Sequence, residues 1–135
     1  MKHLFLDTNI LIDLLSGREP FGAVALFAAA HARQMHLFAS GLSISTCHYI
    51  LERHHPQLNG RALVRQLLPL LTITEVSATV IQQALDSAFA DFEDGLQYYL
   101  ASSNPLVEVI VTRNVKDFLP ADIPVIEPTL AVLLA

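Results

Sequence analysis

The chain has 135 residues, of which 53% are hydrophobic and 16% are charged, and its formal net charge is −5. A chain of this length is one ordinary domain, so we expect a single domain over residues 1–135. The acidic balance counts against a protein that holds nucleic acid by many phosphate contacts, but not against a nuclease in which metal ions meet the phosphate.

Short apolar runs alternate along the chain with segments of helical periodicity. In chain order, the expected strands cover residues 3–6, 36–39, 71–76, 108–112 and 124–126. The expected helices cover about 7–15, 20–35 (beginning at Pro20), 43–54, 60–68, 77–89, 92–102 and 130–134. Strands separated by helices imply a parallel sheet with helices on both faces. We therefore predict a three-layer α/β/α fold with a central, mostly parallel sheet of four to five strands.

Polar residues follow two of the expected strands, at positions 7–9 and 112–114. In sheets of this kind the ligand site lies beyond the carboxyl ends of the strands, so we place the candidate active site there. Three acidic side chains could converge on it. Asp7 ends the first strand, Asp94 lies in the first turn of a helix, and Asp117 follows the fourth strand.

Three carboxylates suit a hard cation such as Mg²⁺ or Mn²⁺, which takes oxygen ligands and usually keeps several waters. Such a cation activates water near neutral pH and offsets charge on a phosphate. Each acid also has a structural interpretation. Asp7 and Asp91 can cap helices, Asp94 can favour a helix dipole, and Asp117 can hold a turn. The hypothesis therefore depends on their joint placement.

Three segments together resemble the signature segments of PIN domains: LDTNILID at 6–13, DFEDGLQ at 91–97 and VTRNVKDF at 111–118. They occur in the order found in that family, and the resemblance covers nearly the whole chain. It is closest to small prokaryotic PIN proteins similar to VapC-type toxins. The resemblance implies a Mg²⁺- or Mn²⁺-dependent ribonuclease, often dimeric and often neutralised by a small antitoxin protein.

Carried over residue by residue, the resemblance assigns Asp7, Asp94 and Asp117 to the metal site and to catalysis. The supporting positions it implies are Asn9, Thr112 and Asn114, and the cations beside the site, which we expect to contact phosphate, are Arg113 and Lys116.

One position departs from the family pattern. The family usually has a glutamate in the helix after the second strand, and if Ser40 and Tyr49 set the register, Thr46 occupies that position here. The carboxylate of the same helix, Glu52, lies six residues further on, and the helical period points it away from the face of Thr46. Asp91 lies three residues before Asp94 and could share its helix face, so it is a possible substitute ligand. Without it the site has one carboxylate fewer than the family norm.

The leading hypothesis is a toxin-like endoribonuclease that hydrolyses RNA phosphodiesters with a metal-activated water. One alternative is a PIN-fold protein that has lost catalysis and binds RNA or protein. Another is an aspartyl-phosphate phosphatase, because an Asp after a first strand can act as a nucleophile. Such enzymes are expected to carry a second Asp two residues on, where this chain has Asn9.

The sequence also suggests a location and partners. Cys47 is the single cysteine, which excludes an intrachain disulfide and fits a cytoplasmic protein. We find no targeting segment and no apolar stretch of the ~20 residues that span a bilayer, so we expect no membrane contact. The charged fraction of 16% is below the typical ~25%, which favours a homodimer that covers apolar surface, although a larger core explains it equally well.

Overall fold

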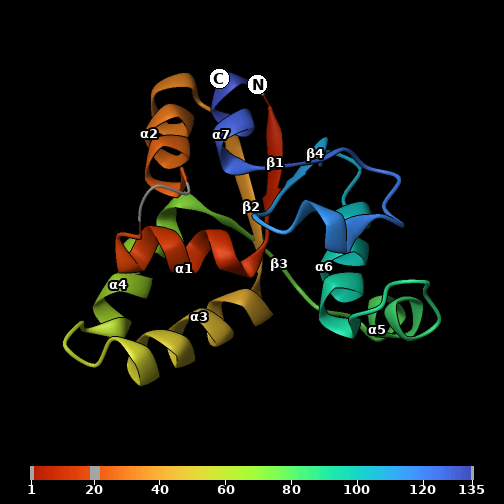
Figure 1. Cartoon of the computed structure of the whole chain (residues 1–135), viewed down its shortest axis with the longest axis horizontal. Coiled ribbons are helices and arrows are strands. Elements are labelled where there is room, and N and C mark those ends of the chain that lie inside the picture. The colour runs from red at the N-terminus through yellow and green to blue at the C-terminus, as the bar shows by residue number, and fades with distance from the viewer. Residues whose placement is uncertain (1, 19–21, 135) are drawn as a thin grey trace.

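The computed structural model describes residues 2–18 and 22–134. Five strands form one sheet in the order β3-β2-β1-β4-β5, and every pair of neighbouring strands is parallel. The strands are β1 (His3–Leu6), β2 (His36–Ser40), β3 (Thr72–Thr74), β4 (Val109–Val111) and β5 (Val125–Ile126). Helices cover both faces of the sheet (Figure 1), so the predicted three-layer fold is confirmed.

Seven α-helices and three short 3-10 helices connect these strands within the described residues. The α-helices are α1 (Thr8–Ser16), α2 (Ala23–Arg33), α3 (Gly41–His54), α4 (Gly60–Leu67), α5 (Ala78–Leu85), α6 (Phe92–Ser102) and α7 (Pro128–Ala131). The 3-10 helices are η1 (Leu68–Leu70), η2 (Val115–Phe118) and η3 (Val132–Leu134). In the described part of the chain, no helix has both the length and the apolar character needed to cross a membrane.

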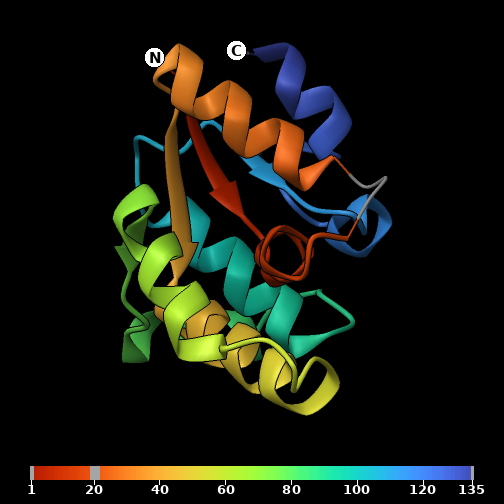
Figure 2. The ribbon, with the colours of Figure 1, turned by 90° about the vertical axis from the view of Figure 1, so that its left-hand side faces the viewer.

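Two hydrophobic cores form because successive side chains of a strand point to opposite faces of the sheet. On one face, Leu4 and Leu6 of β1 pack with residues of α1, α2, α3 and α7. On the other face, Phe5 packs with residues of α5 and α6. Figure 2 shows α2 and α7 together at one end of the molecule, with α3 and α4 at the opposite end.

Capping residues set several helix ends. Ser77 and Asp91 accept hydrogen bonds from the backbone at the starts of α5 and α6. Helix α1 ends at Gly17, whose φ of 68° is a left-handed conformation that glycine adopts without steric cost. These caps explain why the boundaries of α1 and α6 agree with the prediction.

Other boundaries differ from the prediction. Pro20, the expected start of the second helix, lies outside the described residues. Helix α2 ends at Arg33 because Gln34 adopts a left-handed φ of 57°, and Met35 then turns into the core. Helix α5 ends at Leu85 and does not reach Phe89, whose ring packs 5.3 Å from that of Tyr98.

The third strand is also shorter than expected. It covers Thr72–Thr74, because β3 is an edge strand and pairs with β2 only over these residues. The terminal helix begins earlier than expected, at Pro128, which suits a first helical turn. Strand β4 covers Val109–Val111, one residue shorter at each end than the predicted 108–112, so Thr112 follows the strand instead of ending it. Strand β1 ends at Leu6 as predicted.

Candidate metal and active site

The candidate site begins where β1 and β4 end side by side. Leu6 pairs with Val111 in the parallel sheet, so the next residues, Asp7 and Thr112, emerge together. The backbone N–H of Asp7 donates to the carbonyl oxygen of Val111 across 2.9 Å. Asp7 is 7% exposed and Thr112 is fully buried. Asp7 thus lies at the topological switch point of the sheet, beside the carboxyl ends of β1 and β4, where α/β sheets bind ligands.

The carboxylate of Asp7 accepts three hydrogen bonds. Its Oδ1 accepts from the backbone N–H of Thr8 at 2.8 Å. Its Oδ2 accepts from the Thr112 hydroxyl at 2.8 Å and from the amide of Asn9 at 3.2 Å. The structure therefore brings together Asp7, Asn9 and Thr112, as the sequence predicts.

The loop after β4 is tied to the same place. The backbone N–H of Asn114 donates to the Thr112 hydroxyl oxygen at 3.1 Å, and that of Arg113 donates to Oδ1 of Asn9 at 3.3 Å. The N–H of Asp117 then donates to the carbonyl oxygen of Asn114 at 2.9 Å. These hydrogen bonds fix the path of the chain from Thr112 into η2, which contains Asp117.

Asp94 and Asp117 line one cavity of about 410 Å³. Asp91 and Lys116 line it as well, and its other lining residues are Ala88, Ala90, Leu119 and Pro120. Two of the three predicted metal ligands, the possible fourth ligand and one predicted phosphate contact therefore share a cavity.

The acids lie close enough together for their charges to raise the pKa of Asp94, Asp7 and Glu93. Burial and the neighbouring charges raise the pKa of Asp94 to about 7, and the charges come from Asp91, Asp7, Asp117 and Glu93. Burial raises the pKa of Asp7 as well, while hydrogen bonds from Thr112 and Thr8 and the charge of Arg113 oppose that increase. Partial burial and the charges of Asp7 and Asp91 also raise the pKa of Glu93, which still has much of its surface exposed to solvent.

The donor set matches the cations that the sequence suggests. Its oxygen atoms belong to carboxylates, which Mg²⁺ and Mn²⁺ prefer, and a cation would relieve their mutual repulsion. Within residues 2–18 and 22–134, no three His, Cys, Asp or Glu side chains are grouped closely enough to hold one ion directly. A hard cation that keeps several of its waters needs fewer direct protein ligands than such a group supplies.

The position of the missing family acid can be followed along α3. Ser43 is buried, and its hydroxyl oxygen lies 2.8 Å from that of Thr8, the residue after Asp7. Thr46 is half-buried and lies one helical turn after Ser43, on the same side of the helix. Glu52 is 61% exposed and lies 3.2 Å from His48, so its carboxylate is directed elsewhere.

Asp91 has the structural role considered above and also lines the cavity. Its Oδ1 accepts a hydrogen bond from the backbone N–H of Asp94 at 3.1 Å, which caps α6. Both interpretations of this residue therefore remain compatible with its position.

Sequence reasoning missed two buried polar groups beside the site. Asp13 is completely buried in α1, and its Oδ2 lies 2.7 Å from Nε of Arg113, the residue expected to contact phosphate. Gln97 of α6 donates to the hydroxyl oxygens of Thr8 and Ser43 at 2.9 and 2.6 Å. The sequence offered one indication that Asp13 is paired. It is an acid among the apolar residues of α1, and buried carboxylates require partners.

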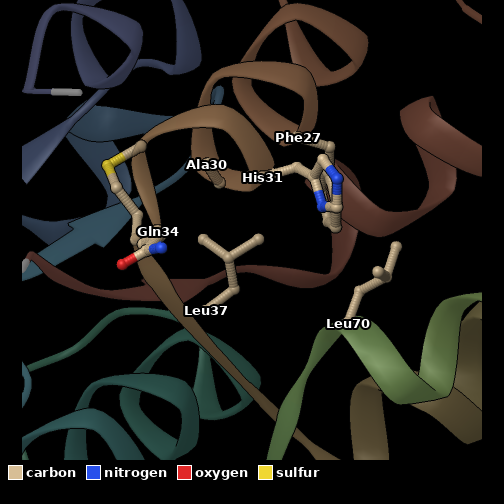
Figure 3. A pocket seen from close by; sticks show the side chains of 7 residues that line it. Phe27, Ala30, His31, Gln34, Leu37 and Leu70 are labelled. Atoms are coloured by element: carbon tan, nitrogen blue, oxygen red, sulfur yellow. The ribbon is translucent and has the colours of Figure 1, made fainter.

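A second cavity, of about 400 Å³, has a different character (Figure 3). Its lining residues come from α2 and the turn after it, from β2 and from η1: Phe27, Ala30, His31, Gln34, Met35, Leu37 and Leu70. None of the described residues that line it carries a carboxylate, so this lining does not suit Mg²⁺ or Mn²⁺. We call it the apolar groove.

Comparisons with known proteins agree with this architecture. The match to a chain of VapBC2 from Rickettsia felis, bound to a promoter DNA fragment, has a TM-score of 0.69 and 16% identity. It covers 93% of the present chain and 97% of the VapBC2 chain. FitAcB from Neisseria gonorrhoeae has a TM-score of 0.67 and 21% identity, covering 93% and 98%. VapC20 of Mycobacterium tuberculosis, a Sarcin-Ricin loop cleaving toxin, has a TM-score of 0.64 and 16% identity, covering 79% and 86%.

The structural likeness at these identities shows the fold. Comparison with curated protein sequences gave no significant match. The family follows from a different comparison, in which a sequence profile of the PIN domain matches residues 3–116. This range includes the ends of β1 and β4, α6 and most of the polar residues described above. The chain therefore belongs to the PIN-domain family.

Proposed function

We propose that the protein is a divalent-metal-dependent endoribonuclease and the toxin of a toxin–antitoxin module. The observation that carries this proposal is geometric: Asp94 of α6 and Asp117 of η2 line one cavity, together with Asp91. Asp7, at the end of β1, lies close enough to these acids for its charge to raise the pKa of Asp94. Such an arrangement costs stability unless a cation or protons offset the charge.

In this proposal, Asp7, Asp94 and Asp117 hold Mg²⁺ or Mn²⁺, in part through the waters that such a cation keeps, and Asp91 is a further candidate ligand. The bound cation would supply activation of the attacking water and compensation of charge on the phosphate. The protein's own contribution is orientation. The carboxylate of Asp7 is fixed by hydrogen bonds from Thr8, Asn9 and Thr112, and Asn114 in turn fixes Thr112.

Lys116 is the phosphate contact that the cavity favours. It lines the same space as Asp94 and Asp117, so its ammonium group can meet a phosphate placed between them. Thr46 occupies the position of the family glutamate and could orient a water through its hydroxyl, but it supplies no negative charge.

We propose RNA as the substrate and a small antitoxin and a second copy of the chain as partners. The support is the resemblance to VapC-type toxins together with the fold shared with VapC20, a Sarcin-Ricin loop cleaving toxin. The composition, with 53% hydrophobic and 16% charged residues, is the separate support for a homodimer.

A catalytically impaired RNA- or protein-binding module is the second candidate, and Thr46 is the observation that favours it. One carboxylate fewer weakens the hold on the metal. For the phosphatase alternative, Asn9 donates its amide N–H to Asp7 where a second Asp is expected, so no observation favours it.

Cleavage of labelled RNA in millimolar Mn²⁺ or Mg²⁺, with EDTA as the blank, tests the proposal. We expect metal-dependent cleavage that Asp7→Asn and Asp94→Asn abolish. Glu52→Gln, on the exposed side of α3, is the matched acid-to-amide control and should cleave normally. Metal binding without cleavage of any RNA would instead support the impaired module.

A further inference from the structure

We propose that Asp13 and Arg113 act as a positioning pair, which orients the 112–117 segment and so the carboxylate site. This inference rests on the proposed function, because it assigns a role in that site to two residues that do not line the cavity. It also changes the interpretation of Arg113, which the sequence suggested as a phosphate contact.

The pair connects the middle of α1 with the loop after β4. Asp13 is completely buried, Arg113 is 25% exposed, and Oδ2 lies 2.7 Å from Nε. Asp13 follows Asp7 by six residues, which at ~1.5 Å per residue places it about 9 Å further along α1. The ion pair is thus well separated from the hydrogen bonds at the start of the helix.

The segment is attached to α1 at two places. Near the start of α1, the Thr112 hydroxyl donates to Asp7 and the backbone N–H of Arg113 donates to Asn9. In the middle of α1, the Arg113 side chain meets Asp13. A segment held at one point can rotate about it, whereas two separated points fix its orientation. The orientation of residues 112–114 determines the path into η2 and the place of Asp117.

The buried position of the carboxylate makes the second attachment demanding. A buried ionised carboxylate requires opposite charge nearby, and the 2.7 Å contact with Arg113 supplies such a charge, so loss of this contact is disfavoured. Arginine has a planar fork of donors that constrains the direction of approach. Buried ion pairs can often be replaced by apolar residues without loss of stability, so specificity of arrangement is the better explanation of their presence.

Asp13→Asn is the decisive variant because it leaves every cavity residue and the charge of Arg113 in place. We expect Mn²⁺ affinity about 10–100-fold weaker, the range found when groups that orient metal ligands are lost. We also expect faster amide hydrogen exchange at Arg113, Asn114 and Asp117 in the metal-free protein. In RNA cleavage, kcat should fall while KM stays unchanged.

Arg113→Gln should have the same effects, and the double variant should lose less than the sum of the two single variants, because both single variants break the same contact. Asp13→Leu with Arg113→Met guards against simple loss of folding. It removes both charges, so the melting temperature should recover while the weak Mn²⁺ affinity and fast exchange persist. Glu52→Gln, which breaks the His48–Glu52 pair of 3.2 Å, should change none of these quantities.

Unchanged Mn²⁺ affinity and exchange in Asp13→Asn would overturn the positioning role. So would recovery of both quantities in the Leu/Met variant along with the melting temperature. A raised KM in Arg113→Gln, with a normal Asp13→Asn, would show that Arg113 contacts phosphate instead. Absence of RNA cleavage by the unmodified protein would contradict the proposed function, and the exchange rates would still decide whether the pair positions the segment.

Discussion

The hydroxyl group of Thr112 donates a hydrogen bond of 2.8 Å to Oδ2 of Asp7, a residue 105 positions earlier in the chain. The bond joins the ends of β4 and β1, and both side chains are buried. It holds one orientation of the carboxylate and opposes the increase in its pKa that burial causes. Thr112 therefore affects both the geometry and the charge of the candidate site.

Thr112→Val should lower the free energy of unfolding by about 1–3 kcal/mol, because a buried acceptor loses its donor. The pKa of Asp7 should rise further, so Mn²⁺ affinity should fall, and the loss should grow as the pH is lowered. Denaturant unfolding and calorimetric titration measure these effects. Thr72→Val, at an exposed position of β3, is the control, and equal effects of the two substitutions would contradict the assigned role.

The metal-free protein should become less stable as the pH rises from about 4 to about 7. The pKa of Asp94 is raised from 3.8 to about 7, so in this range the folded state binds more protons than the unfolded state. The stability that the neutral Asp94 carboxyl contributes is fully present below the unfolded pKa of 3.8 and is lost as the pH rises through the folded pKa of about 7. Melting temperatures at pH 5 and pH 8 measure this, and Asp94→Asn should flatten the difference. A profile unaltered by Asp94→Asn would count against the shift.

Mn²⁺ should stabilise the folded protein. At a free concentration about 100 times its dissociation constant, binding adds ~2.7 kcal/mol to the free energy of unfolding. Asp7→Asn should abolish the increase in melting temperature while the metal-free protein stays folded, as circular dichroism would show. A melting temperature that millimolar Mn²⁺ and Mg²⁺ leave unmoved would weigh heavily against the site.

Thr46→Glu should strengthen Mn²⁺ binding and raise ribonuclease activity. The substitution restores a carboxylate on the side of α3 whose Ser43 lies 2.8 Å from Thr8, next to Asp7. Thr46→Gln is the matched neutral control and should give neither gain. Equal metal affinity in the Glu and Gln variants would show that this side chain does not reach the cation.

Asp91→Asn tests whether Asp91 replaces the missing acid. Asparagine also caps helices well, so the start of α6 should be preserved while one charge is lost. We expect weaker Mn²⁺ binding in the native background and a smaller effect in the Thr46→Glu background. An equal effect in both backgrounds would mean that the two side chains act independently.

Self-association should involve the apolar groove with a second copy of the chain as its occupant. Leu70 lines the groove and is 49% exposed, so Leu70→Glu should shift the protein toward monomer in analytical ultracentrifugation. Leu106→Glu changes a leucine of 56% exposure outside the groove and should leave the assembly state unchanged. A native protein that stays monomeric at high concentration would defeat this prediction.

The order of strands and helices could be predicted from the sequence because it depends on local patterns. Each of these patterns involves only a few neighbouring residues: the apolar runs, the caps Ser77 and Asp91, and Gly17 after α1. Parallel pairing then follows from strands separated by helices. The same logic placed Asp7 and Thr112 at one edge of the sheet. Helix boundaries were predicted less well where packing decides them. Phe89, for example, lies beyond the end of α5, and its ring packs in the core.

Only the tertiary structure decided which polar side chains meet. The pairing of Asp13 with Arg113 depends on the angle between α1 and the loop after β4, which no local pattern specifies. The contacts of Gln97 with Thr8 and Ser43 likewise depend on how three helices pack. The raised pKa of Asp94 depends on burial and on acids from distant parts of the chain. Residue types and spacing determined the candidate chemistry, whereas long-range packing determined its electrostatics, because charge and burial act through space and not along the sequence.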